Sequence, residues 1–304
     1  MASSSQGGTA RAILYAFLAN FGIALAKSAA AWVTGSGSML AEAIHSYADT
    51  GNQVLLYLGL RQSGKAPDGE HPLGYGKSSY FWSFIVATLL FSVGGLFSIY
   101  EGVHKLQQPE PLSQAWVALL VLAVAIVLEG FSLLGCLREI REIRGARPFR
   151  SWLKHTRNSA LVVVFGEDVA ALVGLALAFL FVSLAALTGN AAFDAIGSMC
   201  IGIVLVVISV FLAVRVQSLL VGRSADPIVQ QAIDELIAEQ PNIERVFNTI
   251  TLQLGPDTML AAKIKLASGL ELHAAVQTIN ALERKLKERL PDLRWCFIEP
   301  DVTD

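Results

Sequence analysis

Two pairs of residues in apolar segments have the types and spacing of divalent-metal ligands. His45 and Asp49 lie in Ser38–Leu60, a segment long and apolar enough to cross a bilayer. Positions i and i+4 of a helix share one face, so this imidazole and this carboxylate point the same way. Glu167 and Asp168 are the acids of another apolar segment. Because a charged group in the bilayer costs roughly 2.5–3.5 kcal/mol on insertion scales, we expect these residues to be functional. The sequence therefore predicts a metal site with one half on each segment.

The two acids of the second pair cannot both face one point, because neighbouring helix residues are about 100° apart. Asp168 is the more direct candidate, whereas Glu167 is longer and can reach round. The alternative is that such an acid only bonds to a neighbouring helix. Glu42, one turn before His45, is a candidate guard of the outer entry. Other polar residues in the spans are expected to make structural pairings: Asn20 and Asn52 by hydrogen bonds between helices, and Glu101, Glu129 and Asp194 in polar company, with Lys27 balancing one of these acids.

A second constellation lies in the polar segment Arg61–Lys77, which contains Asp68 and His71. Its glycines and prolines predict a structured turn. An exposed metal site and a solvated loop are equally compatible with these residues.

Composition places both constellations in a membrane protein. The chain is 54% hydrophobic and 16% charged, against about 25% charged residues in soluble domains. A net charge of −2 gives no support for nucleic-acid binding. The three cysteines are far apart in the sequence, which argues against disulfides and a structural zinc cluster.

Six apolar segments approach or exceed the roughly 20 residues that a spanning helix needs. They are Ile13–Val33, Met39–Leu60, Phe81–Val103, Ala115–Leu137, Ser159–Leu187 and Phe193–Val214. We therefore expect an all-α, six-helix membrane domain over residues 1–222. Basic residues fall in alternate loops, which predicts that both termini are cytosolic.

The character of the chain changes after Arg223, and residues 223–304 predict a cytosolic domain. The expected order is a helix at Pro227–Glu239, strands at Ile243–Leu254 and Met259–Leu266, a helix at Leu270–Leu290 and a strand at Arg294–Glu299. This αββαβ order is typical of a small α+β unit of the ferredoxin-like kind. About 80 residues give only a modest core, so a partner subunit would help to stabilise it.

These motifs together resemble the cation diffusion facilitator family over nearly the whole chain. The similarity is carried by HSYADTGNQ in the second segment, DGEHPLGYGKSSYFWSF before and within the third, and FDAIGSMCIG in the sixth. HPLGYGK, LEGFSL and FIEPD are most similar to the divergent branch that contains the ninth human zinc transporter.

The resemblance implies proton-coupled export of Zn²⁺ or a similar divalent cation by a homodimer. The ion would bind between the second and fifth spans, where His45 and Asp49 match the HxxxD motif of the second span. Asp168 matches the aspartate of the fifth span, but Val164 stands where zinc-selective members have histidine. Glu167 is the natural substitute. The resulting donor set is rich in oxygen, which makes Mn²⁺, Fe²⁺ and Co²⁺ credible beside Zn²⁺.

The resemblance also bears on the loop and on the partners. Asp68 and His71 match two members of a second metal site of some relatives, and Tyr75 stands at its third position. The arginine-rich segment 138–157 is a candidate for contact with anionic lipids. The soluble domain is expected to dimerise and to bind little or no metal.

Two other classes of function remain beside transport. The first is a metal-responsive membrane sensor or scaffold without net transport. The second is an intramembrane hydrolase, which is disfavoured because no HExxH motif accompanies the ligands, so the chain is not expected to be an enzyme. The expected location is a bacterial inner membrane or an organelle membrane, as a multi-pass protein.

Overall fold

The computed structural model describes residue 17, residues 20–108 and residues 114–303 of the 304-residue chain. It divides into two compact units. The first contains the described residues up to Gly59, with Phe81–Ala146 and Ser159–Val216. The second contains Leu60–Tyr80, Arg147–Asn158 and the chain from Gln217 onward.

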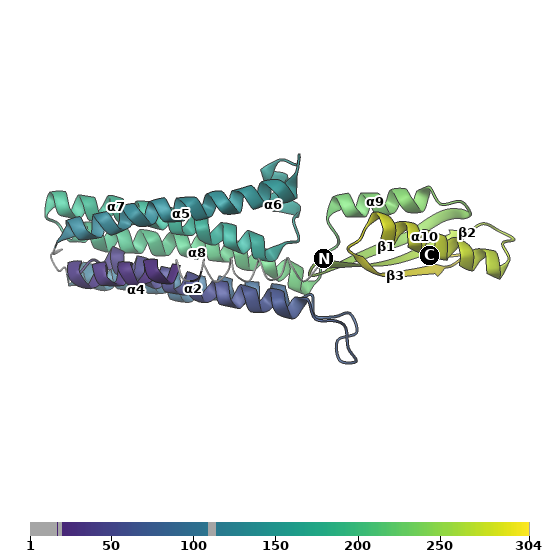
Figure 1. Ribbon diagram of the computed structural model, residues 1–304, viewed down its shortest axis with the longest axis horizontal. Helices are drawn as coiled ribbons and strands as arrows, with labels where there is room; N and C mark the ends of the chain where they lie inside the picture. Colours follow the sequence, from purple (N-terminus) through teal and green to yellow (C-terminus); the bar gives the residue numbers. More distant parts are fainter. Residues whose placement is uncertain (1–16, 18–19, 109–113, 304) are drawn as a thin grey trace. The chain divides into compact units, whose positions relative to one another are not determined.

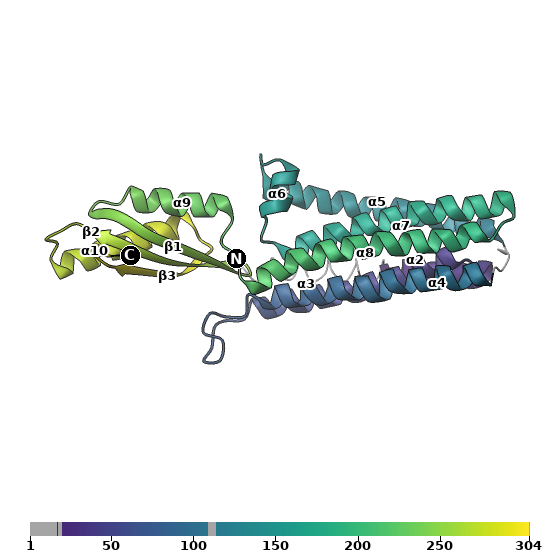
Figure 2. The same cartoon turned by 180° about the vertical axis from the view of Figure 1, so that it is seen from behind.

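The first unit is built from long helices that lie alongside one another (Figure 1). Figure 2 shows the same helices from behind, with α3 and α8 in view. The bounds are residues 20–34 for the first described helix, then α2 Gly37–Ser63, α3 Ser78–Leu89, η1 Leu90–Leu96, α4 Phe97–Gln107, α5 Ala115–Arg144, α7 Ser159–Thr188 and α8 Ala192–Val221. The chain turns sharply between the first helix and α2 at Gly35, whose φ of +66° is the left-handed conformation that glycine adopts readily.

Four helices of the described residues are long and apolar enough to cross a membrane. They are the continuous helix Ser78–Gln107, which comprises α3, η1 and α4, together with α5, α7 and α8. They correspond to the third to sixth predicted spans, so a helical membrane domain is confirmed. The second predicted span is α2, whose 27 residues suffice in length, while its polar residues lower its hydropathy. The first predicted span, Ile13–Val33, lies partly outside the described residues, so the total of six stays a prediction.

Helix α5 continues beyond the predicted end of the fourth span at Leu137 and ends at Arg144. Arg, Glu and Ile make up this last part, and Arg and Glu favour helix when no packing decides. A short helix, α6 at Phe149–His155, follows. Much of the segment that the sequence suggested as an arginine-rich loop is therefore helical.

The second unit contains the predicted αββαβ order. Its elements are α9 Pro227–Ala238, β1 Ile243–Leu254, β2 Asp257–Leu266, α10 Leu272–Arg289 and β3 Leu293–Pro300. Asp226 caps α9 by accepting a hydrogen bond from the Ile228 amide at 3.1 Å, and Pro227 occupies the first turn. Local signals of this kind explain why the predicted bounds agree closely with the observed ones.

The sheet has the order β1-β2-β3, with β1 and β2 antiparallel and β2 and β3 parallel. Leu260, Ala262 and Ile264 alternate along β2 and pack against buried residues of α9 and α10, so the core lies between the sheet and these two helices (Figure 1). This confirms the small α+β class. The ferredoxin-like assignment is not confirmed, because that fold has four strands and the described residues form three.

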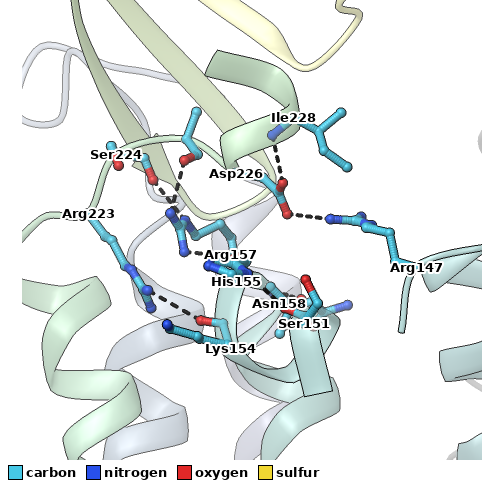
Figure 3. A network of polar contacts seen from close by, with 12 residues as sticks. Arg147, Ser151, Lys154, His155, Arg157, Asn158, Arg223, Ser224, Asp226 and Ile228 are labelled. Atoms are coloured by element: carbon cyan, nitrogen blue, oxygen red, sulfur yellow. Dashed lines mark hydrogen bonds and ion pairs between the residues drawn. The ribbon is translucent and has the colours of Figure 1, made fainter. Parts of the chain in front are cut away.

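A polar network ties α6 and its flanking residues to the segment that precedes α9 (Figure 3). The Arg157 guanidinium donates to the carbonyls of Ser224 at 2.7 Å and Ala225 at 2.9 Å. Arg147 forms an ion pair with Asp226 at 2.8 Å. The chain just before α7 is therefore held against the chain just before α9, which orders both segments within the second unit.

Candidate metal centre

Helix α2 presents His45 and Asp49 on one face, as the sequence predicted. Their Nε2 and Oδ2 atoms are 3.3 Å apart, and the His45 side chain is fully buried. Neither ring nitrogen of His45 has a hydrogen bond to another described residue, nor has Asp49 Oδ1. Because buried polar atoms almost always have a partner, several unpartnered atoms on one face indicate a site that binds something else.

Helix α7 supplies the two predicted acids, which turn toward different helices. Asn52 of α2 donates a hydrogen bond to Glu167 Oε1 at 2.6 Å. Ser132 of α5 donates to Asp168 Oδ1 at 3.2 Å, and Asp168 Oδ2 is buried without a hydrogen bond to any described residue. Glu167 is thus the acid that contacts α2, at Asn52, which is three residues after Asp49 on that helix. Asp168 contacts α5 instead.

The described residues do not form a closed metal site. No three His, Cys, Asp or Glu side chains among them are gathered as they would be around one ion. The structure brings His45 and Asp49 together and links α2 to α7 through the Asn52–Glu167 hydrogen bond. The assignment of Asp168 and Glu167 as further ligands stays a prediction.

A buried ion pair lies one turn from His45. The ammonium of Lys27 is 3.1 Å from Glu42 Oε2 and donates a hydrogen bond to Ser46 Oγ at 2.8 Å. Lys27 and Glu42 are both fully buried. The cation therefore balances Glu42, and not one of the acids that the sequence suggested for it. Glu42 in turn is held by this pair.

The close approach of α7 to Glu42 requires a residue without a side chain at position 174. A Cβ placed on Gly174 would lie 2.5 Å from Glu42 Oε1. A Cβ on Gly94 of η1 would lie 3.9 Å from His45 Nδ1. The π-helical turn of the third span thus lies beside the histidine, and turns of this kind are frequent at functional sites.

Asp194 of α8 fixes the start of α2. Its carboxylate accepts hydrogen bonds from the Ser36 hydroxyl at 2.7 Å and from the amides of Gly37 at 2.6 Å and Ser38 at 3.2 Å. The first amides of a helix lack partners within it, and a carboxylate there also interacts favourably with the helix dipole. The structural role predicted for Asp194 is thus observed, and it sets the position of the helix that carries His45.

Replacing Asp194 by alanine is expected to lower the free energy of unfolding by about 2 kcal/mol, because the first turn of α2 loses its acceptor. Thermal unfolding of the detergent-purified protein would measure this loss. The exposed Glu288 of α10 provides the matched control. If Asp194→Ala lowers the unfolding midpoint no more than Glu288→Ala does, the cap does not contribute to stability.

The loop with Asp68 and His71 is a hydrogen-bonded turn. Asp68 Oδ1 accepts from the His71 amide at 2.7 Å, and Asp68 Oδ2 accepts from the Tyr75 hydroxyl at 2.6 Å. These bonds hold the pKa of the Asp68 carboxyl below its usual value, and the bond from the Tyr75 hydroxyl has the largest effect. The His71 ring nitrogen Nδ1 lies 3.6 Å from Asp68 Oδ1, and its ring stacks at a tilt on Tyr75. The two candidate ligands are close together and exposed, with Tyr75 occupying one carboxylate oxygen.

Sequence reasoning did not include the residues through which other helices support the site. Nothing in the sequence marks Ser132 and Gly174 as residues that support the site, since a lone serine or glycine in an apolar segment is common. The Lys27–Glu42 pair was open to inference, because two opposite charges in neighbouring spans tend to meet.

Comparisons with known proteins agree with these features. Residues 13–221 match the family described as the cation efflux transmembrane domain. The proton-coupled zinc antiporter SLC30A9, mitochondrial, of Xenopus laevis is 35% identical over 84% of this chain, which spans 45% of that relative's length. Metal tolerance protein C4 of Arabidopsis thaliana is 31% identical over 81% of this chain and 54% of its own length.

A solved structure of a MamM CTD variant in a nickel form is 14% identical over 25% of this chain and 98% of that chain, with a TM-score of 0.24, too low to assign a fold. The family match covers well over half of the chain. The matched residues include the four apolar helices and the polar face of α2. The chain therefore belongs to the cation efflux family, also called the cation diffusion facilitators.

Proposed function

We propose that this chain is a proton-coupled antiporter that exports divalent metal cations, Zn²⁺ foremost, from the cytosol. The observation that carries this proposal is the face of α2, where His45 and Asp49 are buried together and several of their polar atoms have no partner among the described residues. The similarity to the Xenopus laevis relative, which is a proton-coupled zinc antiporter, supports both the substrate and the coupling.

The transported ion is the substrate, and we assign His45, Asp49, Asp168 and Glu167 as its ligands in transit. An ion binds to a neutral imidazole and to ionised carboxylates, so its binding releases protons. Protons that return to these groups from the other side release the ion. Six spans around one site within the membrane suit alternating exposure of that site to the two sides.

The preference among metals follows from the donors. Val164, one turn before Asp168 on α7, offers no ligand where a histidine would supply nitrogen. Three carboxylates and one imidazole form a harder set than two imidazoles and two carboxylates. We therefore propose that Zn²⁺ is carried and that Mn²⁺, Fe²⁺ or Co²⁺ compete more effectively than they would at a histidine-rich site.

The test is flux through the purified chain in liposomes that contain a metal-sensitive dye. With an imposed proton gradient, we expect Zn²⁺ entry together with measurable proton counter-movement, and competition by Mn²⁺, Fe²⁺ and Co²⁺ added in turn. A sensor or scaffold would bind the metal in the same preparation and produce no flux. Binding without flux would thus replace the transport proposal by that alternative.

The variant Glu167→Gln separates a ligand from a structural acid. A glutamine oxygen can still accept the hydrogen bond of Asn52, so the link between α2 and α7 remains while the negative charge is lost. We expect metal flux to fall by at least about tenfold with little change in thermal stability. Asn52→Ala is the complementary control, since it removes the hydrogen bond and keeps the charge. Unchanged flux in Glu167→Gln would make Glu167 a structural residue.

We further propose Asp68 and His71 as a weaker second site on the loop. An ion there must displace the Tyr75 hydroxyl from Asp68 Oδ2, which limits its affinity. Equilibrium Zn²⁺ binding to a chain with Asp49→Asn and Asp168→Asn would measure this site after two of the proposed membrane ligands have been removed. Removal of the remaining binding by His71→Ala supports it, and no binding before that change excludes it.

The proposed topology places residues 1–222 in the membrane and residues 223–304 in the cytosol, with both termini cytosolic, in a bacterial inner membrane or an organelle membrane. The α+β domain is proposed to join two subunits as a homodimer, because its core is small. Its mass in solution would test the dimer, and reaction of tags at each end with an impermeant reagent would test the orientation.

Contact with anionic lipids is proposed for segment 138–157 through its exposed arginines. Arg147 and Arg157 bond to the segment before α9, so Arg138, Arg141 and Arg150 are the exposed candidates. Their joint replacement by glutamine is expected to weaken binding to vesicles with anionic lipid, and equal binding would exclude the contact.

A further inference from the structure

Glu129 of α5 is a buried acid that the ligand set does not include. Its side chain is 7% exposed, and it forms no hydrogen bond or ion pair with another described residue. The sequence suggested a structural pairing for Glu129, and no such partner is present among the residues that the structure describes. The oxygens of Glu129 are not among the fully buried atoms without a partner, so this unpaired carboxylate still reaches open space.

Glu129 lines a cavity of about 800 Å³ within the membrane unit. Most of the wall is apolar, with polar groups from four residues: Asn20, Gln53, Glu129 and Ser132. Gln53 Oε1 is also buried without a hydrogen bond to the described part of the chain. The lining thus includes an acid and an amide side chain from different helices, and their oxygens are of the type that hard divalent cations prefer.

The polar part of this cavity lies next to both halves of the candidate centre. Gln53 is one helical turn after Asp49 on α2, so the two residues share a face. Ser132 is one turn after Glu129 on α5 and donates to Asp168 Oδ1 at 3.2 Å. The acid is therefore close to the site without being one of its proposed ligands.

We propose that Glu129, supported by the Gln53 side chain, forms a cation-attracting station of this cavity, which holds a divalent cation next to His45 and Asp49. This inference rests on the proposed transport function and adds α5 as a third helix that takes part in it. The physical reason is electrostatic, since a carboxylate in a surrounding of low dielectric attracts a doubly charged ion far more strongly than it would in water. The apolar remainder of the wall keeps that dielectric low.

The test compares metal-dependent flux of the wild type with that of Glu129→Gln in liposomes. We expect the KM for Zn²⁺ to rise by about tenfold while the maximal flux changes little, because the ligands remain in place. Glu139→Gln is the matched control, since Glu139 is an exposed acid on the same helix, and its KM should stay that of the wild type. Glu129→Asp, which retains the charge, should recover most of the loss.

Gln53→Leu changes another lining residue of the same cavity and should also raise the KM for Zn²⁺. It provides the test if Glu129→Gln fails to fold. A KM equal to that of the wild type in folded Glu129→Gln, or in Gln53→Leu, would overturn the station. A lower maximal flux at unchanged KM would do the same, because it would indicate a structural role. Absence of flux in the wild type, in contrast, would contradict the proposed function itself.

Discussion

Replacing Asp49 or Asp168 by asparagine is expected to reduce metal uptake into liposomes by roughly 100-fold or more, because each change removes a charged ligand from a buried site. Asparagine has nearly the shape of aspartate and keeps one acceptor oxygen, so the packing of α2 and α7 is preserved. The loss should therefore appear in transport and in equilibrium metal binding, with thermal unfolding close to that of the wild type.

The Asp49 and Asp168 variants are independent tests, because the two side chains have different surroundings. Asp49 faces His45 at 3.3 Å, whereas Asp168 is bonded to Ser132 of α5 and has one oxygen without a partner among the described residues. Ser132→Ala removes that bond and keeps the carboxylate, so it should reduce uptake far less than Asp168→Asn does. Uptake near the wild-type rate in either aspartate variant would remove that residue from the ligand set.

Replacing Lys27 by methionine is expected to destabilise the membrane unit by about 3–5 kcal/mol, which is the usual effect of removing one partner of a buried ion pair. Glu42 would be left fully buried without its counter-ion, 3.1 Å from where the ammonium had been. Ser46 would lose a hydrogen bond of 2.8 Å as well. The expected readout is a lower yield of folded protein and a lower unfolding midpoint in detergent.

A second change in the same protein should reverse most of this loss. With Glu42→Gln added to Lys27→Met, no charge is left unpaired at this position, and the side-chain volumes change little. A double variant that is no more stable than Lys27→Met would show that the loss comes from packing. A Lys27→Met variant as stable as the wild type would show that the pair contributes nothing to stability.

Much of the architecture could be predicted from the sequence because it depends on local patterns. The apolar length of α5, α7 and α8 places them in a membrane whatever their neighbours are. The alternation in β1 and the Asp226–Pro227 start of α9 define their elements within a few residues. The spacing of His45 and Asp49 fixes their common face by helix geometry alone.

The partners of each buried group could not be obtained in this way. Sequence spacing shows that Glu167 and Asp168 point in different directions, but the rotation of α7 against α2 and α5 decides which acid meets Asn52 and which meets Ser132. That rotation results from close packing over the whole length of the helices, including the contact at Gly174. A local pattern contains no information on it.

The sequence by itself therefore determined the helical membrane domain, the α+β tail and the shared face of His45 and Asp49 on α2. Only the tertiary structure decided that Lys27 pairs with Glu42, that Asp194 caps α2, and that Glu129 lines a cavity without a partner among the described residues. The physical reason is the range of the interactions. Periodicity and capping act within a few residues, whereas a buried charge is stabilised by groups from distant parts of the chain that meet only in the folded protein.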